Sequence, residues 1–254
     1  MKTFKIKNTI LGEGVPKICV PIVAKTKEEA IEEAKSFADI KADLVELRID
    51  WYDEVNDIKK VKDLLKDLQL ILKDLPLLFT FRTAEEGGEK KITIEDYITL
   101  NKEAAKSGFV DLIDVEVFKG DEVVKDIIAT AHQAGIKVVA SNHDFDKTPA
   151  KDDIVYRLRK MQDLGADIPK IAVMPKSKFD VLELLEATLI MQEKYADRPI
   201  ITMSMSGKGV ISRLAGEVFG SCLTFGAAKK ASAPGQIGVN ELSNVLETIH
   251  KSSN

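Results

Sequence analysis

The period of apolar and polar positions changes regularly along this chain. From residue 17 onward, short apolar runs rich in β-branched residues alternate with longer segments whose apolar residues recur at helical spacing. The short runs predict strands at residues 17–23, 43–49, 76–82, 112–118, 137–143, 168–174, 199–205 and 221–227. The longer segments predict helices at residues 26–38, 57–75, 94–107, 121–134, 148–165, 177–195, 209–220 and 239–250. A strand followed by a helix therefore occurs eight times.

Residues typical of helix ends support these boundaries. Thr26 followed by Glu29 has the spacing of a capping box, and Ser177 is a favourable N-cap for the sixth helix. Thr148 and Pro149 fit the N-cap and the first helical position of the fifth helix. Three helices are followed by glycines that suit a left-handed C-terminal turn: Gly108, Gly135 and Gly165.

The order of the elements predicts the fold. Consecutive strand and helix units imply parallel strands joined by right-handed crossovers, and eight such units in 254 residues predict a (β/α)8 TIM barrel. An open doubly wound sheet would show a glycine-rich turn after the first strand, where this chain has AKTKEE. Residues 1–14 alternate around Phe4, Ile6, Ile10 and Leu11 and predict a β-hairpin closing the bottom of the barrel. We expect residues 1–254 to form a single domain.

Composition narrows the classes of function. The formal net charge is -4 at pH 7, and an acidic chain lacks the basic surface that general binding of nucleic acid or of a membrane surface requires. The first residues lack the apolar run of a signal peptide, and no stretch approaches the roughly 20 apolar residues of a membrane span. We expect a cytoplasmic protein in which Cys19 and Cys222 are reduced and bind no metal.

One predicted strand, residues 168–174, carries a lysine in its middle. Alternation places Lys170 on the same face as Ile168 and Ala172, which we assign to the lumen of the barrel. A buried ammonium is costly, so either the amine reaches water or the site uses it. His143 ends the preceding strand, and its imidazole can carry a proton at neutral pH.

Lys170 beside His143 predicts catalysis by an amine. A lysine attacks a carbonyl only when it is uncharged, and we expect burial and nearby arginines to favour that form. The protonated imine that results makes the adjacent C–H bond acidic, and His143 would remove that proton. A glutamate bonded to the other ring nitrogen would fix the tautomer of the histidine.

Further polar residues fall at the ends of strands, where barrels of this kind place their chemistry. Glu46 and Arg48 form either a simple ion pair at a strand end or part of a ligand site. Gly207 and Gly209 free a loop whose amides, with Arg213, predict a site for an anionic group, either a carboxylate or a phosphate.

Five longer stretches carry a resemblance to a known family. In chain order they read FRTAEEGGE, SNHDF, ADIPKIAVMP, ITMSMSGKGVISRLAGEVFGS and KKASAPGQI. With these stretches the chain resembles type I 3-dehydroquinate dehydratase, the Schiff-base enzyme of the shikimate pathway. The resemblance covers nearly the whole chain. It implies a (β/α)8 barrel, a homodimer, and an enzyme that uses no metal and no organic cofactor.

The resemblance also implies roles for individual residues. Lys170 would form the imine with the C3 ketone of 3-dehydroquinate, His143 would act as general acid and base, and Glu86 would orient His143. Arg213 would bind the substrate carboxylate, and hydrolysis of the last imine would release 3-dehydroshikimate. Residues 226–237 are expected to act as a lid. The other implied or expected substrate contacts are Glu46, Arg48, Arg82, Ser232, Gln236, Met203, Met205 and Phe225.

Two other functions remain open at this stage. A class I aldolase or transaldolase-like barrel also uses a strand lysine, but it cleaves a carbon–carbon bond of a sugar phosphate and would not need His143 paired with Glu86. A catalytically inactive barrel could serve as a binding or scaffold protein. The intact set of Lys170, His143 and Glu86 argues against the second alternative.

Overall fold

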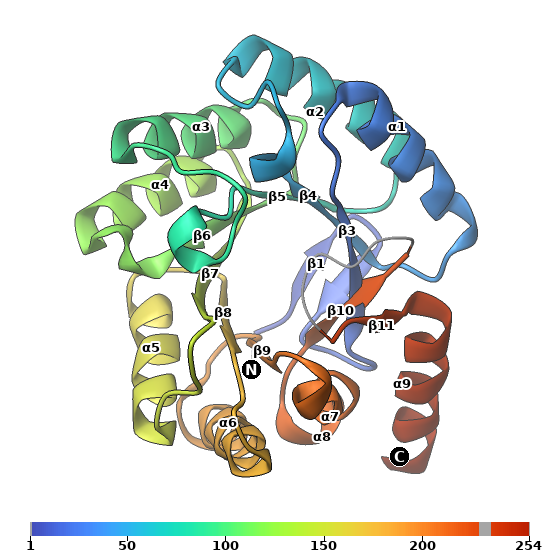
Figure 1. The fold of residues 1–254 in the computed structure, drawn as a ribbon, viewed down its shortest axis with the longest axis vertical. Coiled ribbons are helices and arrows are strands. Elements are labelled where there is room, and N and C mark those ends of the chain that lie inside the picture. Colours follow the sequence, from blue (N-terminus) through green and yellow to red (C-terminus); the bar gives the residue numbers. More distant parts are fainter. Residues whose placement is uncertain (1, 229–234, 254) are drawn as a thin grey trace.

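The computed structural model describes residues 2–228 and 235–253, and it shows a ring of parallel strands surrounded by helices (Figure 1). The strands of the ring are β3 (Lys17–Ile22), β4 (Leu44–Arg48), β5 (Leu77–Thr80), β6 (Leu112–Glu116), β7 (Lys137–Asp144), β8 (Ile168–Val173), β9 (Ile201–Ser204) and β10 (Leu223–Ala227). The α-helices are α1 (Lys27–Lys35), α2 (Ile58–Leu72), α3 (Ile94–Lys106), α4 (Asp121–Gln133), α5 (Lys151–Asp163), α6 (Lys178–Ile190), α7 (Val210–Leu214), α8 (Gly216–Phe219) and α9 (Val239–Ser253).

The strands follow one another around the ring in sequence order. Each strand from β3 to β8 pairs in parallel with the next, and β10 pairs in parallel with β3. The ring closes between β9 and β10 through a parallel bridge of Ile200 with Ser221 and a 2.9 Å hydrogen bond from Cys222 N to Ile200 O. The predicted (β/α)8 barrel is confirmed, and all strands end at the same rim.

Strand alternation separates the apolar residues into two layers. On β8, Ile171 and Val173 pack in the layer between sheet and helices, whereas Ile168 and Ala172 belong to the cluster that fills the lumen. Lys170 has the parity of the lumen residues and is only 3% exposed. The predicted orientation of this strand is therefore confirmed.

The predicted N-terminal hairpin is present. It consists of β1 (Phe4–Ile6) and β2 (Thr9–Leu11), which pair antiparallel and cross the far end of the barrel in Figure 1. Ile6 and Leu11 pack into the lumen cluster, and Leu11 is fully buried. Ile10 is 36% exposed, because only one face of a two-stranded ribbon can lie on the barrel.

Most predicted helix ends are confirmed, with one exception. Capping boxes are present at Thr26 and Ser177. The N-cap predicted at Thr148 is wrong, because α5 begins at Lys151 and Ala150 precedes it without a side-chain cap. The Thr148 hydroxyl instead donates to the carbonyl of Met174 at 3.2 Å and ties this loop to the end of β8.

The seventh predicted helix also differs from the structure. Residues 209–220 form two short helices, α7 and α8, because the chain turns back on itself there. A Cβ at Gly216 would lie 2.8 Å from the carbonyl oxygen of Ser221, and Gly220 has a φ of +104°. A short strand that the sequence did not predict, β11 (Ile237–Gly238), pairs in parallel with β10.

Two expectations drawn from composition can be compared with the structure. Cys19 and Cys222 are both free, as predicted, and burial raises the pKa of the Cys222 thiol to about 12. Over residues 2–228 and 235–253, no helix combines the length and the apolar character needed to cross a bilayer.

Candidate active site

The carboxyl ends of the strands surround a cavity of about 500 Å³, open mouth included. Glu86 does not line this cavity, since it lies behind His143. Ser232 and half of the expected lid fall in residues 229–234, outside the described residues. The other residues proposed from the sequence all line it: Glu46, Arg48, Arg82, His143, Lys170, Met203, Met205, Arg213, Phe225 and Gln236.

Lys170 projects into this cavity from the middle of β8. Its Nζ lies 3.3 Å from Asp114 Oδ2 and 3.7 Å from Glu46 Oε1, and it lies 4.6 Å from the centre of the Phe225 ring. The arginines expected near this amine, Arg48, Arg82 and Arg213, line the same cavity, but its ion pairs are with carboxylates. The lysine is held in place by charge on one side and by an aromatic face on the other.

Asp114 is a site residue that the sequence did not single out. It lies on β6, is fully buried, and accepts hydrogen bonds at Oδ1 from Arg82 Nη2 at 2.8 Å and Ser141 Oγ at 2.6 Å. Burial alone would raise its pKa, but the positive charges of Arg82 and Lys170 outweigh burial and lower the pKa of Asp114. The residue is therefore a fixed negative charge beneath the Lys170 amine.

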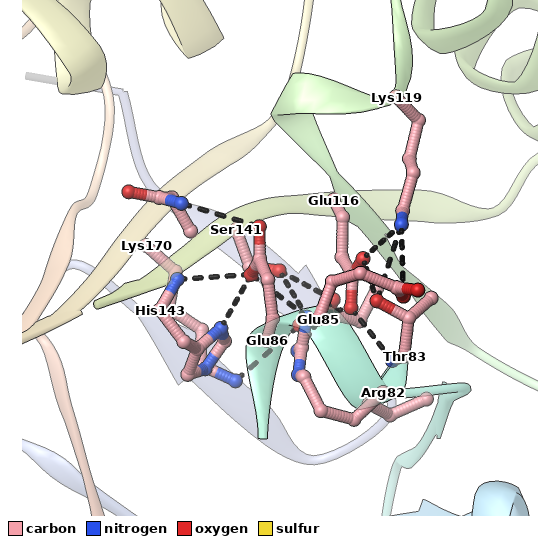
Figure 2. Close-up of polar contacts among 12 residues, drawn as sticks. Arg82, Thr83, Glu85, Glu86, Glu116, Lys119, Ser141, His143 and Lys170 are labelled. Atoms are coloured by element: carbon pink, nitrogen blue, oxygen red, sulfur yellow. Dashed lines mark hydrogen bonds and ion pairs between the residues drawn. The ribbon is translucent and has the colours of Figure 1, made fainter. Parts of the chain in front are cut away.

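Arg82 anchors the acidic groups around this lysine. Its Nη1 donates to Glu116 Oε1 at 2.9 Å and to Ser141 Oγ at 3.0 Å, while Nη2 binds Asp114 (Figure 2). Burial would lower the pKa of Arg82, but the neighbouring carboxylates hold it well above its usual value. Arg82 lines the cavity, yet much of its hydrogen-bonding capacity is used inside the protein.

His143, next to β8 on β7, is paired with Glu86. Its Nδ1 lies 3.0 Å from Glu86 Oε2, and its main-chain N–H donates to the same oxygen at 2.9 Å (Figure 2). Burial, with the charges of Arg82, Lys170 and Arg48, holds the pKa of His143 well below its usual value of 6.5. When Glu86 is ionised its carboxylate can only accept, so the proton is then on Nδ1 and the lone pair on Nε2.

The turn after β5 explains how Glu86 reaches His143. Residues Ala84–Glu86 form one turn of 3-10 helix, and Gly87 follows with a φ of +80°. A Cβ at Gly88 would lie 1.9 Å from the carbonyl oxygen of Arg82, so only glycine allows the chain to pass there. Burial raises the pKa of Glu86 to about 7, against the lowering effect of Arg82.

Glu46 and Arg48 do not pair with each other, although the sequence left that ion pair open. Glu46 accepts a 2.9 Å hydrogen bond from Thr80 Oγ1, in addition to its ion pair with Lys170. Arg48 instead makes two 2.8 Å hydrogen bonds to the carboxylate of Asp50, which is fully buried. Asp50 orients the guanidinium at the edge of the cavity.

Arg213 reaches the cavity from α7, opposite these acids. It is 1% exposed, and burial lowers its pKa to about 10, so it is a cation at neutral pH. The amides expected to help bind an anion are engaged elsewhere: Gly209 N donates to Ser206 O at 3.2 Å and Lys208 N to Ser206 Oγ at 3.4 Å. Charge on the anion side of the cavity therefore comes from the Arg213 side chain.

The profile of the type I 3-dehydroquinase family matches residues 18–253 of this chain. A 3-dehydroquinate dehydratase of Clostridioides difficile is 59% identical over 250 residues, which cover 98% of both chains. The chain belongs to the type I 3-dehydroquinase family. The resemblance found in the five sequence stretches is confirmed, and so is the prediction of an enzyme of the 3-dehydroquinate dehydratase type.

Solved structures of type I 3-dehydroquinases have the same fold. The crystal structure of the type I 3-dehydroquinate dehydratase from Clostridium difficile with covalent modified comenic acid superposes with a TM-score of 0.96 at 58% identity and covers 99% of both chains. The 3-dehydroquinate dehydratase of Geobacillus kaustophilus superposes with a TM-score of 0.97 at 35% identity, covering 100% of this chain and 98% of that one.

Three residues of this type I 3-dehydroquinase site were given no role from the sequence: Asp50, Asp114 and Asn142. Asp114 shares its parity with Glu116 on β6, and two acids on one face of an apolar strand were a readable signal. Asn142 matters through Glu86, 56 residues away in the chain, which a pattern along the chain does not reveal. Asp50 acts on Arg48, only two residues before it in the turn after β4.

The other histidines and the acidic residues add no second centre. His132 pairs with Asp167 at 2.8 Å and His250 with Glu217 at 2.6 Å, both away from the cavity. In the part of the chain that the structure describes, no three His, Cys, Asp or Glu side chains gather into a group that could hold a metal ion.

Proposed function

We propose that this protein dehydrates 3-dehydroquinate to 3-dehydroshikimate through an imine on Lys170, with His143 as general acid and base. The observation that carries the proposal is a buried lysine, 3% exposed at the base of the cavity, one strand away from a histidine whose pKa is held well below 6.5. Family membership and the names of full-length relatives support the choice of substrate.

Imine formation begins when the neutral Lys170 amine attacks the C3 ketone. The carbinolamine takes up a proton, equivalent to the one that the Lys170 ammonium gave up, and loses water, so that Nζ becomes part of a positively charged iminium. Asp114, 3.3 Å from Nζ in the free enzyme, offers a negative charge to that cation. The covalently modified comenic acid named for the C. difficile relative is consistent with a site that bonds to its ligand.

Dehydration follows in two proton transfers by His143. Nε2 removes the C2 proton, and the electrons of that bond flow into the iminium to give a neutral enamine. The enamine expels the C1 hydroxyl, which takes the proton from His143 and leaves as water. Addition of a second water to the new iminium releases 3-dehydroshikimate and restores Lys170, so one water is lost overall.

Charged groups on the walls of the cavity support binding of the substrate carboxylate and hydroxyls. Arg213 is a buried cation at one side, and we propose that it binds the carboxylate. Arg48, oriented by Asp50, and Glu46, 3.7 Å from Lys170 Nζ, are proposed to bind hydroxyls near the reacting carbon. Gln236, Ser232 and the apolar side chains Met203, Met205 and Phe225 complete the proposed contacts.

The decisive experiment traps the imine. The enzyme is mixed with 3-dehydroquinate and sodium borohydride, and the reduced adduct is mapped by peptide mass spectrometry. We expect one adduct on Lys170 and, without borohydride, accumulation of the enone product. Lys170→Met should give neither, while Lys176→Met, at an exposed lysine in the loop after β8, should give both.

An adduct on another lysine, or turnover by Lys170→Met, would overturn the imine mechanism. Cleavage of a sugar phosphate with no enone from 3-dehydroquinate would favour the aldolase alternative instead. A homodimer is likewise proposed here on the family resemblance, and a cytoplasmic location on the composition of the chain. Light scattering of the purified enzyme tests the dimer.

A further inference from the structure

Two adjacent residues of β7 contact the same carboxylate. His143 Nδ1 approaches Glu86 Oε2 at 3.0 Å, and Asn142 Nδ2 donates to the other oxygen, Oε1, at 3.2 Å. Asn142 is 6% exposed and Glu86 8%. Both carboxylate oxygens therefore receive a hydrogen bond from β7, and the mechanism above uses only one of them.

Arg157 decides which end of the Asn142 amide faces Glu86. Its Nη1 donates to Asn142 Oδ1 at 2.9 Å, which leaves the NH2 group directed at the carboxylate. The orientation of an amide is assigned from its hydrogen-bond network, and here that network is unambiguous: a guanidinium can only donate and a carboxylate can only accept. A flipped amide would set oxygen against oxygen at Glu86.

Arg157 is itself held by α5, the helix outside β7 and β8. Its Nε and Nη2 bind the two oxygens of Asp153 at 3.2 and 2.7 Å, and its guanidinium lies 5.7 Å from the centre of the Phe118 ring. The chain of contacts from Asp153 through Arg157 and Asn142 ends at the carboxylate beside His143. A helix on the outer layer thus reaches the proposed general base through three side chains.

We propose that Arg157 and Asn142 are positioning residues that keep Glu86 an ionised hydrogen-bond acceptor and so hold His143 in the tautomer with its lone pair on Nε2. If Glu86 took up a proton, its hydroxyl would donate to Nδ1 and the ring proton would move to Nε2. His143 could then no longer act as a base. This inference rests on the role of His143 given under Proposed function.

The pKa of Glu86 is set by opposing effects, so the hydrogen bond from Asn142 affects whether Glu86 is ionised. The charged groups that face Glu86 are Arg82, 3.6 Å away after β5, the acids Glu116 and Asp114 on β6, and His143 on β7. Burial, with these acids, raises the pKa of Glu86 to about 7, whereas Arg82 and the bond from Asn142 lower it. Because the pKa of Glu86 lies near neutral pH, the loss of a single hydrogen-bond donor changes the fraction of Glu86 that is ionised.

The test follows the tautomer of His143 in the free enzyme by 15N NMR between about pH 6 and pH 9. The chain has three histidines, so comparison with His143→Gln assigns the signals. In wild type the unprotonated nitrogen should change from Nδ1 to Nε2 as the pH rises through about 7. In Arg157→Met this change and the acidic limb of kcat/KM should both move up by about one pH unit, a tenfold loss below pH 7.

Controls separate this effect from damage to α5. Arg157→Lys keeps the charge and one donor and should recover part of the wild-type tautomer, and Arg159→Met, on the exposed side of α5 over Tyr195, should match wild type. If Arg157→Met does not fold, Asn142→Ala removes the donor to Glu86 Oε1 itself and should give the same shift. An unchanged tautomer at each pH and an unchanged pH profile in folded variants would overturn the inference, whereas failure of the imine trap in wild type would overturn the proposed function.

Discussion

The Oε2 atom of Glu86 accepts two hydrogen bonds from His143, one from the main-chain N–H at 2.9 Å and one from Nδ1 at 3.0 Å. Because the same oxygen binds the backbone and the ring, the imidazole has one orientation relative to β7. That orientation leaves Nε2 free to act as a base next to Lys170, whose strand neighbours β7.

This arrangement predicts the pH dependence of the reaction. Burial raises the pKa of Glu86 to about 7, so the carboxylate form is lost as the pH falls through that value. We expect kcat/KM to fall by about tenfold for each pH unit below it. Glu86→Gln should lower kcat and remove this acidic limb from the pH profile. Glu85→Gln, at the exposed neighbouring acid, should keep the wild-type kcat and the acidic limb.

Replacing the general base should separate attack from proton transfer. In His143→Ala the Lys170 amine is intact, so borohydride should still trap an adduct with 3-dehydroquinate. Turnover should fall by about 10² to 10⁴-fold, the usual contribution of a positioned acid–base group. His250→Gln, a change in the last turn of α9, should leave turnover as in wild type, and near-normal turnover by His143→Ala would refute the assigned base.

The anion side of the cavity predicts a binding defect. Arg213→Met removes a buried cation that we propose binds the substrate carboxylate, and a hydrogen bond to a charged group contributes about 1.5 to 3 kcal/mol. We expect KM to rise by about 10 to 100-fold, with a smaller change in kcat. Steady-state kinetics of Arg198→Met, whose Nη1 binds Ala166 O at 2.6 Å before β8, provide the matched control.

Asp114 should be important for stability as well as for activity. Asp114→Asn leaves Arg82 and Lys170 without their shared counter-ion in a buried site, and breaking such a pair costs about 3 to 5 kcal/mol. Urea unfolding should show this loss in the free energy of unfolding. Glu85→Gln alters an acid whose side chain is 60% exposed and should change that free energy by about 0.5 kcal/mol or less.

Gly88 should tolerate no side chain. In Gly88→Ala the new Cβ would lie 1.9 Å from the Arg82 carbonyl oxygen, and relieving that clash must displace the turn that carries Glu86. We expect a loss of about 1 to 3 kcal/mol in the free energy of unfolding and a marked loss of turnover. Gly207→Ala, where a Cβ has no neighbour within 4 Å, should be mild in both measurements.

The sequence predicted what depends on local period and on position along a strand. Alternation on β8 placed Lys170 in the lumen, and the end of β7 placed His143 at the rim, because strand parity and barrel topology together fix these positions. The role of Glu86 came only from the family resemblance.

What the sequence did not predict depends on contacts across the structure. Asp114 faces Lys170 from two strands away, and Arg157 reaches Asn142 on β7 from helix α5, so neither contact has a spacing to recognise. Thr148 has the chemistry of an N-cap, but a tertiary hydrogen bond to Met174 uses its hydroxyl instead. The local preference of Thr148 for an N-cap position is therefore outweighed by a partner 26 residues away in the chain.

The hairpin of β1 and β2 closes the amino-terminal end of the barrel. In the part of the chain that the structure describes, Ile6 and Leu11 fill the amino-terminal end of the lumen, so Lys170 is approached from the rim where the strands end. Substrate must enter, and product must leave, through the same opening at this rim, and the cavity cannot hold both at once. Each turnover therefore begins only after the previous product has left. Accumulated product should slow the enzyme because it competes with substrate for the cavity.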